Sequence, residues 1–321
     1  MTIKYNGKNL IKRIINGQEV EKVMYNWVQI RPDVVPPTVD YLCFTANTAG
    51  STVKFSWDAS YSIAAPNLQY SYDKTTWIDY QYWSYAQWET ITLNNVWDKI
   101  YFRNKAETPT ALCTYYHTQN FVLTGSISAS WDVWFMLCRY STNVIPDYWL
   151  KYLFVNCTAL TTAPRLPATQ VWTRGYAEMF SGCSWLTTTP ELPATTLSYY
   201  CYFKMFSSCT SLTTVPSLPA LTLADGCYYE MFRWCTSIIS LPELPATNLT
   251  VACYMGMFNE CTSIKLSDTQ WWEYQTPYII PIWWGWTDDT NSLYDMFLNT
   301  WWSWTWTPII NTTYYTSNTI I

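Results

Sequence analysis

The sequence predicts a mainly β chain with short helices, in which a β-meander and a β-sandwich precede an α/β solenoid of 26-residue repeats. Three observations carry this prediction. Asn-Gly dipeptides punctuate residues 1–36, apolar and polar side chains alternate through residues 37–140, and one motif recurs throughout residues 141–267. The last segment, residues 268–321, departs from the period. We therefore expect four parts, divided after residues 36, 140 and 267.

The first segment is predicted to be a β-meander. Asn6-Gly7 and Asn16-Gly17 are dipeptides that two-residue hairpin turns favour, and Asn26-Trp27 follows at the same spacing. A small set of hairpins is only marginally stable in water, so we expect it to pair with another domain or chain. The prolines within residues 32–37 predict a linker after it.

The second segment, residues 37–140, is predicted to form an antiparallel sandwich. Strand-like alternation is clear in residues 53–57, 68–72 and 99–102, with turn signals between them. His117 is the single histidine of the chain, and no cysteine or carboxylate lies around it at ligand or catalytic spacing. We therefore expect a structural or surface role for it rather than general-base catalysis.

The 26-residue repeat is the strongest signal. A Met-Phe dipeptide recurs at this interval, and a cysteine follows each Phe by three residues. The four dipeptides are Met179-Phe180, Met205-Phe206, Met231-Phe232 and Met257-Phe258. Cys201, Met205 and Cys209 lie at helical spacing, whereas the prolines of the L-T-T-x-P-x-L-P segment exclude a helix there. We expect one strand and one short helix in each repeat, with equivalent side chains in columns.

The repeat motif resembles that of the BspA-like leucine-rich-repeat proteins, through the pattern YCYxxMFxxCTSLTTAPxLPATTL over roughly residues 141–264. These proteins lie on the surfaces of gut and oral anaerobes and occur in some of their phages. The resemblance implies a curved solenoid used for adhesion or receptor recognition. Residues 294–297 echo the Met-Phe motif 39 residues after the preceding copy, which predicts an interrupted last repeat and a C-terminal cap.

The resemblance implies a non-enzymatic recognition protein. The leading hypothesis is a phage fibre or tail-associated protein on the virion surface, which contacts a glycan or protein receptor on a bacterial surface. Residues 1–36 resemble, over a short stretch, the attachment ends of phage fibre proteins, so they would join other virion or surface-structure subunits. The alternative is a bacterial cell-surface adhesin, although the first residues lack the apolar segment of a signal peptide. A homo-oligomer is compatible with both.

Composition argues against several other classes. The net charge of -5 and the scattered basic residues argue against nucleic acid as a partner. No apolar run reaches the about 20 residues of a membrane-spanning helix. Motifs of serine hydrolases and nucleotide-binding loops are absent, and we expect no cofactor and no metal. A repeat-bearing carbohydrate-active enzyme is a third hypothesis, but the carboxylate pair that it needs is not evident.

Variable polar positions beside the predicted strands are the candidate ligand-binding residues. They form two columns at repeat spacing. The first column is Thr162, Thr188, Thr214 and Ser240, and the second is Arg165, Glu191, Ser217 and Glu243. The alternative is that both columns are simply solvated. The pairs Tyr199-Tyr200 and Tyr228-Tyr229 could stack on sugars, but Tyr228 also belongs to a strict tyrosine column, which favours packing.

The eleven cysteines contain no C-x-x-C motif. In the predicted helix two turns separate Cys201 from Cys209, which is too far for a disulfide between them. Columns of buried thiols are the expected arrangement, and bridges between neighbouring repeats are the alternative.

The balance of 21 Trp against 9 Gly is unusual. Four tryptophans, Trp149, Trp172, Trp185 and Trp234, stand in repeat columns that otherwise hold small residues, and Trp27 stands at the glycine position of a predicted turn. Buried substitutions of this size would overpack the core. We hypothesise that most of the tryptophans are glycines in the natural protein, through a UGA codon read as glycine. The alternative is a genuine enrichment of aromatic residues for binding.

Overall fold

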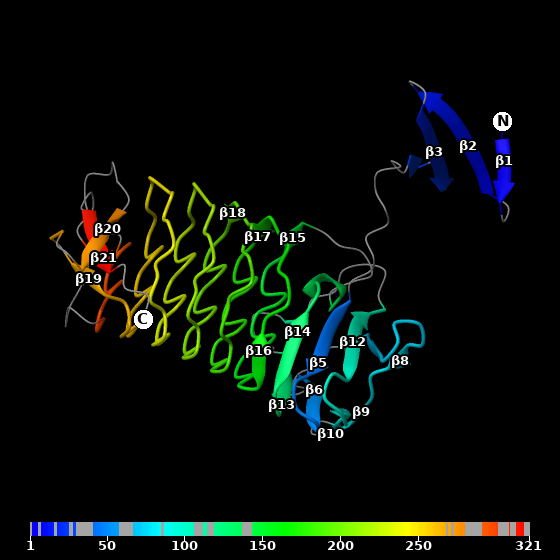
Figure 1. Cartoon of the computed structure of the whole chain (residues 1–321), viewed down its shortest axis with the longest axis horizontal. Helices are drawn as coiled ribbons and strands as arrows, with labels where there is room; N and C mark the ends of the chain where they lie inside the picture. Colours follow the sequence, from blue (N-terminus) through cyan, green and yellow to red (C-terminus); the bar gives the residue numbers. More distant parts are fainter. Residues whose placement is uncertain are drawn as a thin grey trace. The chain divides into compact units, whose positions relative to one another are not determined.

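The computed structural model describes residues 2–5, 8–15, 18–25, 28–29, 41–57, 67–84, 87–105, 112–113, 119–136, 143–267, 269–270, 273–279, 291–300, 308 and 313–317. The chain divides into two compact units, Met1–Asp40 and Tyr41–Ile321 (Figure 1). Within the described ranges, no helix has the length and apolarity that crossing a membrane requires.

The first unit is an antiparallel sheet with the strand order β1-β2-β3-β4. Its strands are Thr2–Tyr5, Lys8–Ile15, Gln18–Tyr25 and Val28–Gln29. Tyr5 pairs with Lys8 and Ile15 with Gln18, so consecutive strands are joined by two-residue connections. Those connections, which include the Asn-Gly dipeptides and Trp27, lie outside the described residues.

The second unit begins with two sheets packed face to face. One is six-stranded, in the order β16-β14-β5-β12-β7-β8, and the other is three-stranded, in the order β11-β6-β13. Their strands are β5 (Leu42–Ala46), β6 (Ser51–Trp57), β7 (Leu68–Ser71), β8 (Ile78–Asp79), β11 (Thr90–Leu93), β12 (Lys99–Asn104), β13 (Gln119–Thr124), β14 (Ile127–Ser130) and β16 (Leu160–Thr162). A short hairpin, β9 (Tyr82–Ser84) with β10 (Gln87–Trp88), is separate.

Four buried phenylalanines form the centre of this packing. Phe44 and Phe102 come from the larger sheet, and Phe55 and Phe121 from the smaller one. Phe121 meets Phe44 and Phe55 edge to face, with ring centroids 4.7 and 4.9 Å apart. Because the apolar faces of both sheets meet here, alternate residues of each strand turn inward, which produces the alternating sequence pattern.

The larger sheet continues directly into the repeats. Strand β14 pairs in parallel with β16, the first strand of the repeat region, so that Ile127 lies opposite Leu160. In the other layer, the Phe121 ring stacks on the Phe154 ring at 5.5 Å, and the Phe121 amide donates to the Leu153 carbonyl at 2.8 Å. The sandwich therefore covers the apolar end of the first repeat.

The repeats lie side by side as a stack (Figure 1), and backbone hydrogen bonds join neighbouring copies. In residues 198–209, alternate amides donate to the next repeat: the Tyr202 amide to the Cys227 carbonyl at 3.0 Å, and the Phe206 amide to the Met231 carbonyl at 2.9 Å. The intervening amides close four-residue turns; for example, the Met205 amide donates to the Tyr202 carbonyl. We call this segment and its equivalents the turn ribbon.

Every second turn of the ribbon has a positive φ at its third residue. In residues 198–209 these residues are Tyr200, Lys204 and Ser208, with φ of 54, 49 and 62°. The same three positions have positive φ in the neighbouring copies. This geometry is that of successive type II turns rather than of a right-handed helix, in which every φ is negative.

The predicted fold class is therefore wrong. The described chain is nearly all β, in several small sheets, and its one helical element is the 3-10 turn Val133–Met136. Neither short helices in the repeats nor a leucine-rich-repeat α/β solenoid is supported. The helix was predicted because of the spacing of the buried residues. The ribbon buries Cys201, Met205 and Cys209 at intervals of four residues, which is close to the 3.6-residue period of an amphipathic helix.

Outside the ribbon, three two-residue strands pair in parallel: β15 (Val144–Ile145), β17 (Gln170–Val171) and β18 (Thr196–Leu197).

Stacked columns of identical side chains fill the repeats. Ring centroids of successive phenylalanines lie 5.3 to 5.6 Å apart from Phe154 to Phe297. A tyrosine column runs parallel to it, with Tyr202 and Tyr228 stacked at 5.7 Å. Cysteine thiols form another column, in which Cys209 Sγ donates to the Phe180 carbonyl of the preceding repeat at 3.1 Å. All ten described cysteines are buried and free.

At the other end, residues 291–300 form the last ribbon. The Phe258 amide donates to the Met296 carbonyl at 2.9 Å, and the Phe258 and Phe297 rings stack. A three-stranded antiparallel sheet follows, with the order β19-β21-β20, and consists of Leu266–Ser267, Thr313–Ser317 and Tyr274–Ile279. Its Tyr278 ring lies edge-on to Phe297 at 6.4 Å, so the sheet covers the final apolar column.

The tryptophans of the repeats do not overpack the core. Trp172, Trp185 and Trp234 are 47, 53 and 44% exposed, and Trp149 is partly buried against the core. The overpacking argument for a glycine at the three exposed positions is therefore wrong. Of the four, Trp234 alone has a positive φ, at 64°.

Backbone conformation nevertheless singles out three tryptophans. Besides Trp234, the residues Trp97 and Trp131 have φ of 73 and 68°. Trp97 is the third residue of a turn closed by the Asp98 amide on the Asn95 carbonyl, and its side chain is 73% exposed. Such a position favours glycine, because a bulky side chain at positive φ is strained. The glycine hypothesis thus rests on these three positions.

Replacing Trp97 with glycine is expected to stabilise the chain. The free energy of unfolding should rise by about 1 kcal/mol, because glycine removes the strain of positive φ, and the Trp97 side chain, which is 73% exposed, loses little buried area. Trp185→Gly is the control, since Trp185 is 53% exposed but has no positive φ. Urea denaturation measures both variants, and an equal gain for Trp185→Gly would contradict the explanation.

Candidate functional site

The structure places all eight candidate ligand-binding residues on the surface. Each is exposed, and equivalent residues follow one another along one edge of the stack. The hydroxyl column is Thr162, Thr188, Thr214 and Ser240, and the charged or polar column is Arg165, Glu191, Ser217 and Glu243. Buried leucines alternate with the second column, so these segments are extended and direct every second side chain outward. We call residues 162–167 and their equivalents the proline face.

A pocket of about 430 Å³ lies at the first two repeats of the proline face. It is lined by Asp132, residues 163–167, Pro190, Glu191 and Pro193. The pocket brings together Arg165 and Glu191, two of the candidates, across neighbouring repeats. The hydroxyl column and the remaining candidates, Ser217 and Glu243, are not part of its lining.

Asp132 is the pocket residue that sequence reasoning missed. It follows β14, and isolated parallel bridges place it between Tyr41 and Arg165. Its carboxylate pairs with the Arg165 guanidinium at two points: Nε lies 3.0 Å from Oδ1, and Nη2 donates to Oδ2 at 3.3 Å. Only the packing of the sandwich on the first repeat brings these residues together, so no local sequence signal marks Asp132.

The pocket combines apolar walls with a small excess of negative charge. Asp132 and Arg165 neutralise each other, while Glu191 forms no ion pair with another described residue. Proline rings line the walls and have a fixed φ, so the backbone around the pocket is stiff. The arrangement suits a polar ligand that presents hydroxyl or cationic groups to the carboxylates and an apolar surface to the prolines.

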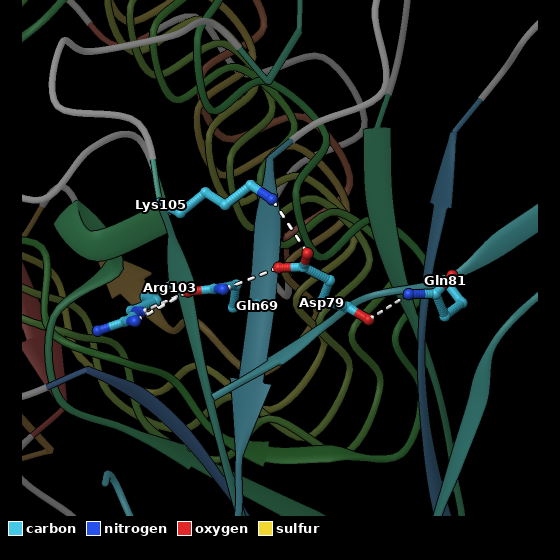
Figure 2. A network of polar contacts seen from close by, with 5 residues as sticks. All are labelled: Gln69, Asp79, Gln81, Arg103 and Lys105. Carbon is cyan, nitrogen blue, oxygen red and sulfur yellow. Dashed lines mark hydrogen bonds and ion pairs between the residues drawn. The ribbon is translucent and has the colours of Figure 1, made fainter. Parts of the chain in front are cut away.

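A second polar cluster lies on the outer edge of the sandwich (Figure 2). Arg103 Nη2 donates to Gln69 Oε1 at 2.8 Å, and Gln69 Nε2 donates to Asp79 Oδ1 at 2.8 Å. The hydrogen bond from Gln69, followed by that from Lys105, lowers the pKa of the Asp79 carboxyl. Because these groups satisfy one another across β12, β7 and β8, the cluster holds the edge strand in register.

The described cysteines are poor nucleophiles. Burial raises the pKa of the Cys201 thiol from its ordinary 9.0 to about 12, and that of Cys253 to about 11. Burial raises the pKa of Cys209 well above 9.0 as well. The thiolate is the reactive species, so these side chains remain protonated and inert near neutral pH. His117 lies outside the described residues. In the described part of the chain, no group of three His, Cys, Asp or Glu residues could hold a metal ion.

In comparisons with known proteins, no family model, curated protein or solved structure matches the chain.

The buried thiols are expected to resist alkylation while the chain is folded. At a pH of about 8.5 an exposed cysteine is substantially ionised, whereas the raised pKa of Cys201 and Cys209 keeps both protonated and their burial blocks access. Iodoacetamide labelling followed by peptide mass spectrometry should find both unmodified until urea unfolds the chain. Rapid labelling of Cys209 in the native chain would contradict the buried column.

Proposed function

We propose that the chain is a non-enzymatic recognition protein that binds a receptor on a bacterial surface through the pocket of the proline face. The observation that carries this proposal is the convergence of Arg165, Glu191 and Asp132 around proline walls. These residues offer hydrogen-bonding groups of both charges, and the described cysteines supply no accessible nucleophile beside them. Binding is the activity that such a pocket supports best.

The resemblance of the repeat motif motivates the more specific part of the proposal. On that basis the chain is a phage fibre or tail-associated protein, displayed on the virion surface, with residues 1–36 joining it to other subunits. The separate folding unit at the N-terminus is compatible with such a division of roles, since an attachment unit and a receptor-binding unit need no shared core.

The pocket is arranged before a ligand arrives. Arg165 is held at two points by Asp132, and the proline backbone has little freedom to lose. The Arg165 side chain is 59% exposed, so this ion pair contributes little to the stability of the fold. Removing the Arg165 side chain should therefore change binding without unfolding the chain.

Binding of the purified full chain to a panel of gut and oral anaerobic bacteria tests the proposal. Arg165→Ala should weaken binding to a recognised strain at least about tenfold, equivalent to about 1.4 kcal/mol, because the pocket loses its cation. Ser217→Ala is the matched control, since Ser217 occupies the same column outside the pocket.

Flow cytometry with fluorescently labelled protein measures both variants, and a thermal melt verifies that each is folded. The proposal is wrong if the chain binds no strain of the panel. It is also wrong if Arg165→Ala and Glu191→Gln bind as tightly as the original chain.

A further inference from the structure

Four aromatic rings gather on the solvent side of the turn ribbons of two neighbouring repeats. They are Tyr199, Tyr200, Phe203 and Tyr229, which we call the aromatic patch. Centroids are 4.3 Å apart for Tyr199 and Tyr200, 5.3 Å for Tyr200 and Phe203, and 5.4 Å for Phe203 and Tyr229. Tyr199 is 48% exposed and the other three are partly exposed. The patch is therefore a contiguous group rather than scattered surface rings.

The fold itself does not require these rings. In this copy buried pairs, such as Cys201 with Tyr202, alternate with more exposed pairs, and the rings occupy the more exposed positions. One repeat earlier, Thr173 and Ala177 stand where this copy has Tyr199 and Phe203, yet the ribbon has the same hydrogen bonds. In contrast, Tyr228 lies in the buried column. The aromatic character of the patch thus calls for an explanation other than packing.

The rings are held in place before any ligand binds. The Tyr200 ring lies against the backbone of Gly226, where an added Cβ would be 2.6 Å from Tyr200 Cε2. From the preceding repeat, the Arg174 guanidinium lies 5.0 Å from the Tyr200 centroid and 5.3 Å from that of Phe203. These cation–π contacts and the missing side chain at Gly226 fix the orientation of the rings.

Charged groups border the patch. Lys204 Nζ lies 3.2 Å from Glu230 Oε2, which Arg233 Nη1 also contacts at 3.1 Å, and Lys204 lies over the Phe203 ring at 5.0 Å. The surface thus combines flat apolar rings with hydrogen-bond donors and acceptors within reach of their edges.

The size of the patch decides between classes of ligand. A large aromatic side chain buries about 150–250 Å² when fully covered, so four partly exposed rings offer less than ~400 Å². A stable interface with a folded protein needs about 800 Å² on each side, with an apolar centre. The patch falls well short of that area. One or two sugar rings fit it better, because their C–H faces can stack on the aromatic rings while their hydroxyls reach the charged border.

We propose that the aromatic patch is a carbohydrate-binding site that stacks pyranose rings of a bacterial surface glycan on Tyr199 and its neighbours. The proposal rests on the proposed function, because it makes that glycan part of the receptor. It uses different residues from the pocket of the proline face, so the two can fail separately.

The test is binding of the full chain to a printed array of bacterial cell-surface oligosaccharides. The chain should bind at least one glycan, and Tyr199→Ala should weaken that binding about tenfold through loss of the exposed stacking ring. Tyr199→Phe keeps the ring and should retain binding. Tyr294→Ala is the matched control, since Tyr294 is also 48% exposed on a turn ribbon but forms no ring contact with another described residue.

The outcomes of this test distinguish the two sites. Loss of glycan binding in Tyr199→Ala, with binding kept in Tyr294→Ala, supports the aromatic patch. Binding to no glycan on the array overturns it, as does unchanged binding by Tyr199→Ala or equal loss in the Tyr294 control. If Arg165→Ala no longer binds bacterial cells while Tyr199→Ala binds both the cells and the glycans normally, the pocket is supported and the patch is wrong.

Discussion

The hydrogen bonds between neighbouring turn ribbons are the constraint on which the repeat region depends. Half of the ribbon amides are satisfied only by a carbonyl of the next copy, as Phe206 is by Met231. A single repeat would leave these groups without backbone partners, so the copies are stable only as a stack. Both ends of the stack accordingly need a cover: the sandwich at β14 and Phe121, and the sheet of β19, β21 and β20 at the other end.

The same constraint explains why some positions hold the same residue type in successive copies of the repeat while others differ between copies. Inside, the ribbons stack identical rings and thiols on one another, so Phe and Cys recur in every copy from Phe154 to Cys261. Outside, the side chains do not affect the ladder, and neighbouring copies can differ. The pocket at Arg165 and Glu191 and the aromatic patch at Tyr199 both arise at such outside positions, which allows binding surfaces to change without altering the fold.

Sequence reasoning found the period and the columns, but not the conformation that produces them. The spacing of Cys201, Met205 and Cys209 fits a helix and a four-residue ribbon equally well, and positive φ at Lys204 leaves no clear trace in residue type. Residues outside the repeat pattern were harder still. Asp132 meets Arg165 only through packing of the sandwich on the repeats. The strict tyrosine column correctly predicted packing for Tyr228, whereas no column marked the exposed Tyr199.

Scalar coupling across hydrogen bonds, measured by NMR on labelled full chain, tests the turn ribbon most directly. The account predicts a coupling between the Phe206 amide nitrogen and the Met231 carbonyl carbon, since that hydrogen bond joins two repeats. A helix would instead couple the Phe206 nitrogen to the carbonyl carbon of Tyr202, four residues earlier. Observation of the Tyr202 coupling would contradict the ribbon and the surfaces built on it.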